Sequence, residues 1–437
     1  LEGDSDFTEI ELSVRSIWSD ILEIDEERIF KGDNFFDLGG NSLSAISLIN
    51  KLAKDLEVKV PLDEVFATPT LEGLSAYIEK STKSDHKAIP VLEDQEYYGL
   101  SSAQRRMYFL YEFNRESITY NMPNVVILRG SLDTERFENT IKSLISRHES
   151  LRTYFEMQGD EVYQKILPEE SVSFSVDHYQ GDALESEKTR KIIENYIRPF
   201  DLSQGPLLRV GLIQINSEEH ILMLDMHHII TDGVSQGILV KDFMELYKDD
   251  SSLKELGLRY VDYSDWQQKE GIEAKSKDYW MEVYKDIPEV LDIPTDYPRG
   301  SVRDEGGSSV VFELAKPQVE GLKKFSEEYG ITLYMLLLGI YKILLSKLSG
   351  QEDVVVGTPV AGRGHSDVEG IVGLFVNTLA LRSDVKAAKS FKSYIKDLGE
   401  RVISSFDHQD FQYEELVNLL EIERDTSRNA LFDVMFS

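Results

Sequence analysis

The 437-residue sequence contains no cysteine, which excludes disulfides, thiolate metal sites and a cysteine nucleophile. Any thioester chemistry would therefore need a sulfur atom from outside the polypeptide. Basic residues are also scarce. Lys and Arg number 47 against 79 Asp and Glu, so the net charge is −32, which argues against binding to a nucleic-acid backbone. Residues 1–80, with 18 acidic and 7 basic side chains, predict either a strongly hydrated surface or an acidic docking surface.

Long apolar runs are absent too. No run reaches the roughly 18 residues of a membrane span, and the N-terminus lacks the features of a signal peptide. The most apolar stretch, Leu333–Leu345, is interrupted by Gly339, Tyr341 and Lys342, which favours a buried helix. With 41% hydrophobic residues, the chain is typical of a globular protein of two or three domains. We expect a monomer in the cytoplasm that does not bind a membrane.

The chain divides into a helical N-terminal part and a mixed remainder. Residues 1–80 contain helical patterns in 7–22, after Ser42, after Val60 and from Pro69 to Ile78. Residues 81–98 are polar and predict a linker. Strands are predicted at 125–129, 207–215, 221–227, 308–314 and 353–360, and helices at 134–147, 236–248, 318–329, 332–349 and 391–406. This mixture predicts an α/β or α+β domain.

Ser42 lies in a glycine-rich turn, Gly39-Gly40-Asn41-Ser42-Leu43, directly before an apolar-faced helix. The hydroxyl suits a helix cap as well as a reactive group. A serine hydrolase would require glycine two residues after the serine, where this chain has Ser44. The string from Asp33 to Leu43, DNFFDLGGNSL, resembles the signature of carrier domains in nonribosomal peptide synthetases. That resemblance implies a 4'-phosphopantetheine arm on Ser42, which would supply the missing thiol.

A histidine pair is the sharpest chemical feature of the large domain. His227 and His228 follow an apolar run predicted as a strand, and Asp232 and Gly233 come next. Neighbouring strand residues point to opposite faces, so we expect one imidazole in the core and the other in a channel. Neutral imidazole can accept a proton from an attacking amine or orient it. A metal site is disfavoured because the two rings diverge and no further ligands cluster with them, whereas a structural histidine pair remains an alternative.

The histidine string matches the HHxxxDG motif of the acyltransferase superfamily that includes condensation domains of peptide synthetases and chloramphenicol acetyltransferase. Six further condensation motifs are present in the expected order, at 101–108, 147–153, 260–266, 372–378, 408–411 and 424–433. The resemblance covers residue 99 to the end of the chain. It implies two chloramphenicol-acetyltransferase-like lobes in a V shape, at 99–270 and 271–437, after the carrier domain and linker.

By this resemblance the chain forms peptide bonds: the acceptor amine attacks the donor thioester beside His228, which acts as a base or positions the amine. His227 and Asp232 are expected to support it, and backbone donors near Gly233 to stabilise the oxyanion. Arg363 is the expected partner of Asp232, and Asn377 is expected near the channel or between the lobes. Implied partners are an upstream adenylation domain, downstream adenylation and acceptor carrier domains, and a phosphopantetheinyl transferase.

Three other domain types are alternatives to this interpretation, and the sequence differs from the family pattern at two places. Epimerization domains share the histidine pair but differ in the later motifs. Heterocyclisation domains carry paired aspartates instead, and non-catalytic recruiting domains of the same fold typically lose the catalytic histidine. The chain stops at 432–437, in a predicted strand, where the family continues, so we expect an incomplete last lobe and a fragment of uncertain activity. The sixth motif also lacks the usual proline. The sequence does not identify the amino acids joined or the donor stereochemistry.

Overall fold

The computed structural model describes residues 7–83, 87–248, 253–270, 274–300, 306–422, 425 and 427–437. The chain forms two compact units, and each is described by itself. Unit 1 comprises Leu1–Lys87, Ile272–Ser366 and Asn377–Ser437, and unit 2 comprises Ala88–Gly271 and Asp367–Val376. Arg424 and Thr426 of the last predicted motif lie outside the described residues.

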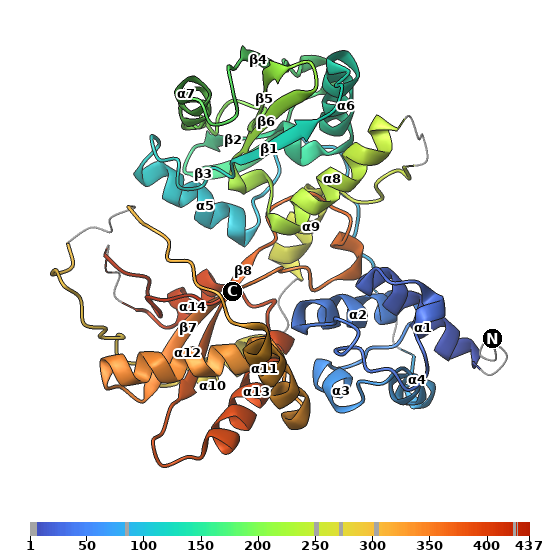
Figure 1. Cartoon of the computed structure of the whole chain (residues 1–437), viewed down its shortest axis with the longest axis vertical. Coiled ribbons are helices and arrows are strands. Elements are labelled where there is room, and N and C mark those ends of the chain that lie inside the picture. The colour runs from blue at the N-terminus through green and yellow to red at the C-terminus, as the bar shows by residue number, and fades with distance from the viewer. Residues whose placement is uncertain are drawn as a thin grey trace. The chain divides into compact units, whose positions relative to one another are not determined.

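The N-terminal part of unit 1 is a small helical domain, drawn in blue in Figure 1. Its helices are α1 (Glu9–Leu22), α2 (Ser42–Asp55), α3 (Leu62–Ala67) and α4 (Leu71–Lys80), with a 3-10 turn at Glu26–Arg28. The first helix starts with a capping box, in which Thr8 and Glu11 each accept from the other's backbone N–H. Trp18, Phe35, Leu48 and Leu52 are fully buried and hold the helices together. All four predicted helices are confirmed.

The rest of unit 1 is a two-stranded sheet with helices. Its elements are α10 (Ala274–Val283), α11 (Lys316–Tyr329), α12 (Leu333–Ser349), β7 (Asp353–Val360), β8 (Asn377–Asp384), α13 (Phe391–Asp407) and α14 (Tyr413–Leu419). The two strands are antiparallel, and helix α12 contacts β7 and α13. Lys342, in the predicted buried helix, is fully buried beneath this sheet. The residues at 432–437 form only an isolated bridge, from Met435 to Gly357, instead of the predicted strand.

The strand predicted at 308–314 is wrong, because these residues have no regular structure. Their alternating apolar pattern is typical of a strand, but no described strand pairs with them. Without those hydrogen bonds the segment forms no strand, and Val310 and Val311 are each 88% exposed.

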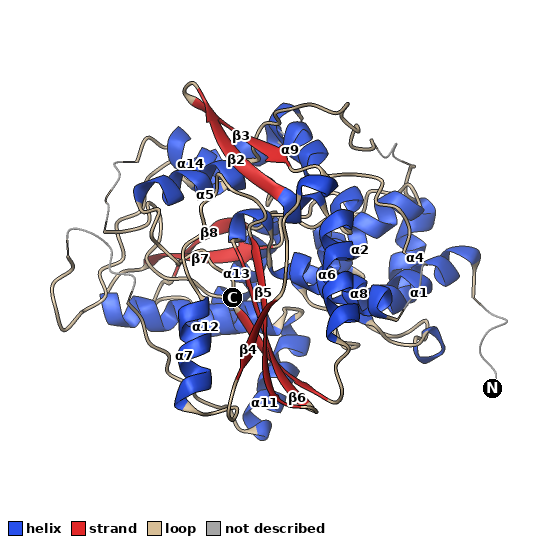
Figure 2. Ribbon diagram, turned by 90° about the horizontal axis from the view of Figure 1, so that it is seen from above, coloured by secondary structure: helices blue, strands red, loops and turns tan. Residues whose placement is uncertain are grey.

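Unit 2 contains a four-stranded sheet in the order β1-β6-β5-β4. Its strands are β1 (Asn124–Arg129), β4 (Asp177–Gln180), β5 (Leu208–Asn216) and β6 (Glu219–Met226), and β2 (Thr153–Gln158) pairs with β3 (Glu161–Ile166) as a hairpin. The β5–β6 and β1–β6 pairs are antiparallel and the β4–β5 pair is parallel. The long central strands β5 and β6 are prominent in Figure 2. This sheet carries the histidine motif at the end of β6.

Five α-helices accompany the sheet in the described part of unit 2. They are α5 (Ser102–Phe113), α6 (Thr134–Arg147), α7 (Glu187–Tyr196), α8 (Gly233–Tyr247) and α9 (Tyr260–Lys269). Helices α6 and α8 lie side by side (Figure 2). The predicted class, a small all-α domain before a mixed helix-and-sheet domain, is confirmed. Among the described residues no single helix is long and apolar enough to cross a membrane, although the bent pair α11 and α12, at 104°, passes the same length and composition test.

Candidate functional site

Ser42 is the first residue of helix α2, but its hydroxyl does not cap that helix. Asn41 provides the cap, because its Oδ1 accepts from the Ser44 N–H at 3.1 Å and its own N–H donates to the Ser44 hydroxyl at 2.7 Å. The Ser42 Oγ is buried and bonds to no described residue. The fold therefore has no structural use for this hydroxyl. Since Ser42 is only 4% exposed, reaction at its oxygen requires a local movement that uncovers it.

The turn before Ser42 explains the two glycines. Gly39 has φ of +110°, which side-chain-bearing residues rarely adopt. A Cβ on Gly40 would lie 2.4 Å from the ring of Phe35, so Gly40 lets the turn pack directly on the core of the domain. The first turn of α2 contains no acidic residue, and free N–H groups at a helix start favour phosphate. These residues fit a phosphodiester-linked arm on Ser42.

His227 has a structural position. Strand β6 ends at Met226, so the pair follows the strand rather than lying on it, which corrects the prediction. The His227 Nδ1 accepts from the Ile229 N–H at 3.2 Å, and the ring lies edge-on to Phe200. Burial, aided by the neighbouring His228, lowers the pKa of His227 to about 3. This imidazole is neutral at physiological pH and shapes the turn.

His228 presents a defined ring nitrogen. Its backbone N–H donates to the Tyr120 carbonyl at 2.8 Å, and its Nδ1 lies 2.8 Å from the Thr231 carbonyl oxygen. A carbonyl oxygen can only accept, so Nδ1 carries a hydrogen, and in the neutral ring Nε2 is then the nitrogen with the lone pair. In contrast to His227, the side chain of His228 is only partly buried. The two rings are therefore placed in different environments, and His228 has a free proton acceptor.

Asp232 fixes the turn that holds His228. It is fully buried and caps helix α8, with Oδ1 accepting from the Ser235 N–H at 2.8 Å and Oδ2 accepting from the Phe375 N–H at 3.0 Å. Sequence reasoning missed both of these donors. The signal for Ser235 was its place three residues after an aspartate at a helix start. A Cβ on Gly233 would meet no atom within 4 Å, so the space beside it is open.

An ion pair between the buried Asp225 and the half-buried Arg209 lies at the end of strand β6 and was also missed. The β5–β6 register places Arg209 opposite Asp225, whose Oδ2 accepts from Arg209 at 3.2 Å and from the Asn121 amide at 2.8 Å. The Arg209 guanidinium lies 3.6 Å from the centre of the Phe200 ring, and that ring contacts His227. Burial raises the pKa of Asp225, and the Asn121 and Arg209 contacts oppose this. The network anchors the strand end that precedes the motif.

Arg363 and Asn377 belong to unit 1, whereas Asp232 belongs to unit 2. The ion pair between Asp232 and Arg363 therefore stays a prediction. The Arg363 carbonyl accepts from the Asn50 amide of α2 at 2.8 Å. Asn377 is buried, donates to the Gln409 and Phe411 carbonyls at 2.8 and 2.9 Å, and accepts from the Tyr413 N–H at 3.2 Å. The structure thus gives the Asn377 amide bonds to the sixth motif, within its own unit.

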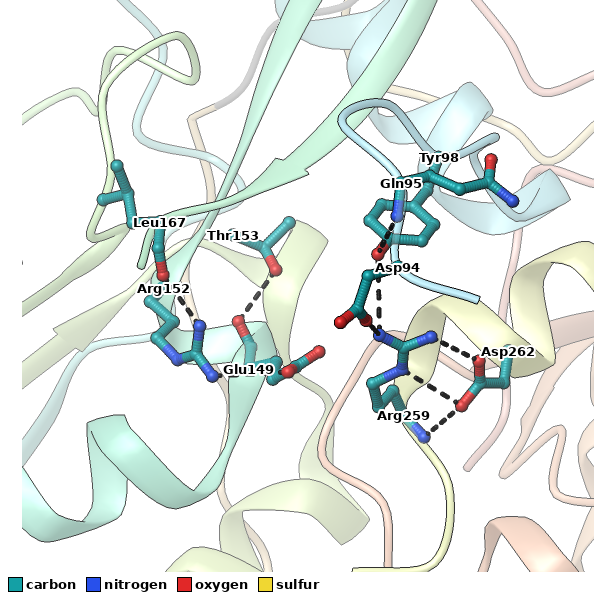
Figure 3. Close-up of polar contacts among 9 residues, drawn as sticks. All are labelled: Asp94, Gln95, Tyr98, Glu149, Arg152, Thr153, Leu167, Arg259 and Asp262. Atoms are coloured by element: carbon teal, nitrogen blue, oxygen red, sulfur yellow. Dashed lines mark hydrogen bonds and ion pairs between the residues drawn. The ribbon is translucent and has the colours of Figure 1, made fainter. Parts of the chain in front are cut away.

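A second polar cluster surrounds a cavity of about 910 Å³ beside the second motif of unit 2. Glu149, Arg152 and Arg259 line it, and His228 does not. Figure 3 shows Arg259 between Asp262 of α9 and Asp94, to which it donates at 2.7 Å. Burial raises the pKa of Glu149 against the attraction of Arg152 and Arg259. Arg259 therefore binds the last part of the predicted linker to helix α9.

Two family models match the chain in sequence order. Residues 13–78 match the model described as a phosphopantetheine attachment site, and residues 94–437 match the condensation domain. Gramicidin S synthase 2 of Brevibacillus brevis is 43% identical over 434 residues, which are 98% of this chain and 10% of that protein. Bacitracin synthase 3 of Bacillus licheniformis is 41% identical over 432 residues, which are 98% of this chain and 7% of that protein.

Solved structures resemble the chain over most of its length. A holo four-domain nonribosomal peptide synthetase bound to AMP and glycine has a TM-score of 0.71 at 26% identity, covering 80% of this chain and 27% of that one. The X-domain from teicoplanin biosynthesis has a TM-score of 0.72 at 22% identity, covering 80% and 79%, and shows the fold alone. The chain spans between 6 and 16% of the length of the curated relatives that it matches.

Proposed function

Because this chain belongs to the condensation domain family, with a phosphopantetheine attachment domain before it, we propose that it forms peptide bonds in nonribosomal peptide synthesis. Ser42 holds the donor arm, and His228 serves the bond-forming step. The observation that carries the proposal is the hydrogen bond between the His228 Nδ1 and the Thr231 carbonyl, which leaves Nε2 as an acceptor.

His228 performs the proton transfer in this scheme. The acceptor α-amine forms a C–N bond to the donor carbonyl carbon while the C–S bond of the thioester breaks. The lone pair on Nε2 takes the proton that the amine loses, and returns it to the departing thiolate. The Thr231 carbonyl stabilises the positive charge that develops on the ring. The same contact between Nε2 and the amine also orients the amine. His228 thereby serves both as the base and as the positioning group expected from the resemblance.

Ser42 and its surroundings hold the arm. When bound, phosphopantetheine supplies the thiol that carries the acyl group. Two features support Ser42 as the attachment point. Its hydroxyl bonds to no described residue, and the first turn of α2 contains no acidic side chain that would repel a phosphate. Since the attachment domain precedes the condensation domain on one chain, Ser42 serves as the donor carrier in cis. An acceptor carrier, adenylation domains and a phosphopantetheinyl transferase complete the reaction, which we place in the cytoplasm.

Two other functions compete with condensation. An epimerization domain would use His228 to move the α-proton of an aminoacyl group, and a recruiting domain would bind an enzyme without catalysis. The presence of His228 with a fixed tautomer disfavours the recruiting domain. Product analysis separates condensation from epimerization, since only condensation consumes an acceptor amine.

The test uses the whole chain, loaded with an aminoacyl arm by a phosphopantetheinyl transferase. An aminoacyl acceptor carrier is added, and dipeptidyl product is measured by mass spectrometry. We expect His228→Ala to lower the rate by about 100-fold or more. His178→Ala is the matched control, because His178 is exposed on strand β4 of the same unit. Equal product from wild type and His228→Ala would refute the catalytic role.

A further inference from the structure

Residues 372–375, which we call the strap, are held by side chains at four consecutive backbone positions. They have no regular secondary structure and belong to unit 2. The Ser150 hydroxyl donates to the carbonyl of residue 372, Ser235 bonds to residue 373, Tyr260 donates to the carbonyl of residue 374, and Asp232 accepts from the N–H of residue 375. Ser150, Asp232 and Tyr260 belong to three separate sequence motifs, and Ser235 follows the histidine motif by two residues. A segment without its own secondary structure thus has its conformation imposed by the site around it.

Ser235 makes the central contact of this arrangement. Its Oγ accepts from the Gly373 N–H at 3.0 Å and donates to the Gly373 carbonyl at 2.9 Å. Its own N–H donates to Asp232 at 2.8 Å, and its side chain is fully buried. Asp232 in turn accepts from the Phe375 N–H. The serine, the aspartate and the strap therefore form a closed ring of hydrogen bonds in unit 2.

The Tyr260 side chain packs against the strap and bonds to it. A Cβ on Gly373 would lie 1.9 Å from the Tyr260 ring, so only glycine allows this approach. The Tyr260 hydroxyl bonds to the Leu374 carbonyl and lies 2.8 Å from the Ser101 Oγ. The ring also contacts Phe375 edge-on. Tyr260 thus fixes the strap by packing and by a hydrogen bond at adjacent residues.

From this geometry we infer that Ser235 and Tyr260 are positioning residues for the reaction at His228, a role that rests on the proposed function. They fix the strap, the strap fixes Asp232, and Asp232 fixes the turn that carries the Thr231 carbonyl. That carbonyl holds the His228 ring in its tautomer and orientation. Through these bonds their effect reaches the reaction by the position of the Asp232 turn.

A positioning role and a purely structural role predict different kinetics. If Ser235 only stabilises the fold, the folded fraction of Ser235→Ala works at the wild-type rate and only its Tm falls. If it positions the turn, kcat falls in fully folded protein while KM stays nearly constant, because the substrate binding surfaces are unchanged. We expect about a 100-fold loss of kcat, as for other misplacements of reacting groups.

The experiment measures kcat and KM of the loaded chain at a temperature well below the Tm of each variant. Tyr260→Phe removes one hydroxyl without a cavity and is expected to lower kcat about 10-fold, while Ser235→Thr keeps the hydroxyl and restores most of the activity. Ser143→Ala and Tyr163→Phe are the matched controls, because the hydrogen bonds of both hydroxyls are exposed to solvent and lie within unit 2. Each control should keep the wild-type kcat.

The outcomes separate this inference from the proposed function. If His228→Ala is inactive but Ser235→Ala and Tyr260→Phe keep the wild-type kcat, the positioning role is refuted and the function stands. The positioning role is also contradicted if kcat falls for both Ser235→Ala and Ser235→Thr while Tyr260→Phe is fully active. If wild type forms no dipeptide, the proposed function fails, and the positioning role fails with it.

Discussion

Lys342 makes the stability of unit 1 depend on pH. Its ammonium is fully buried and lies 3.0 Å from the Val354 carbonyl, 2.6 Å from the Leu381 carbonyl and 3.0 Å from the Ser383 hydroxyl. Three acceptors match its three N–H groups, yet no carboxylate bonds to it among the described residues. Burial, the dominant cause, lowers the pKa of Lys342 from 10.5 to about 7.

The sign and size of the effect follow from linkage. Between pH 7 and pH 10.5 the unfolded chain keeps the Lys342 proton while the folded chain releases it, so the free energy of unfolding rises with pH. Below pH 7 both states are protonated and the cost of the buried charge is fully present. Integrating the proton difference from pH 7 to pH 9 gives a gain of about 2 kcal/mol from this one group.

The assay is urea unfolding of wild type and Lys342→Met at pH 7, 8 and 9. The difference between the two proteins at each pH cancels the titration of other groups, and the absence of cysteine removes the side chains that most often titrate in this range. We expect wild type to gain about 2 kcal/mol relative to Lys342→Met across the range. A difference that is constant with pH, or that shrinks from pH 7 to pH 9, would refute the reasoning.

Three further predictions test other parts of the chain. Treatment with a phosphopantetheinyl transferase and coenzyme A should add the arm to wild type and to Ser44→Ala but not to Ser42→Ala, as read from intact mass; an adduct on Ser42→Ala would remove the carrier assignment. Asp225→Asn leaves the half-buried Arg209 without its counter-charge, so urea unfolding should show a loss of about 3 kcal/mol, and a loss below about 1 kcal/mol would contradict a stabilising role of the pair. Asn377→Ala leaves two backbone N–H groups and two carbonyls without their side-chain partner, so the free energy of unfolding should fall by about 2 kcal/mol and the Tm with it, while kcat stays unchanged. Lost kcat at unchanged Tm would place Asn377 in the channel instead.

Much of the fold was predictable because its signals are local. Helix α6 and strand β7 have the predicted bounds, since apolar periodicity and caps define their ends. The β2–β3 hairpin was missed although its strands are neighbours in the sequence, and β4 was missed because its pairing with β5 is not a local signal. The segment 308–314 shows the opposite error, a strand pattern without a partner strand. Local sequence therefore predicts the propensity of a segment, while pairing decides whether it becomes a strand.

In the candidate site, too, local features were predictable and long-range contacts were not. Ser42 and His228 were identifiable from short motifs, because each motif is continuous in the sequence. The bonds that hold them were not, since Arg209 and Asp225 come together only through the β5–β6 register. The contact between Asp232 and the Phe375 N–H joins residues 143 positions apart. A motif thus identifies the reacting group, whereas its supports come from strand register and long-range packing.

The condensation motifs of unit 2 consequently contain both a residue suited to chemistry and residues that hold the backbone. His228 offers a ring nitrogen for chemistry, but Ser150 and Tyr260 of the second and fourth motifs, and Ser235 just after the histidine motif, bond to the backbone of the fifth. A side chain that bonds to backbone groups needs its hydroxyl for that contact, so losing the hydroxyl leaves a buried backbone group without its partner. A motif match therefore does not by itself make a residue catalytic. Of these four residues, His228 combines partial exposure with a free acceptor, and this combination separates it from the residues that hold it in place.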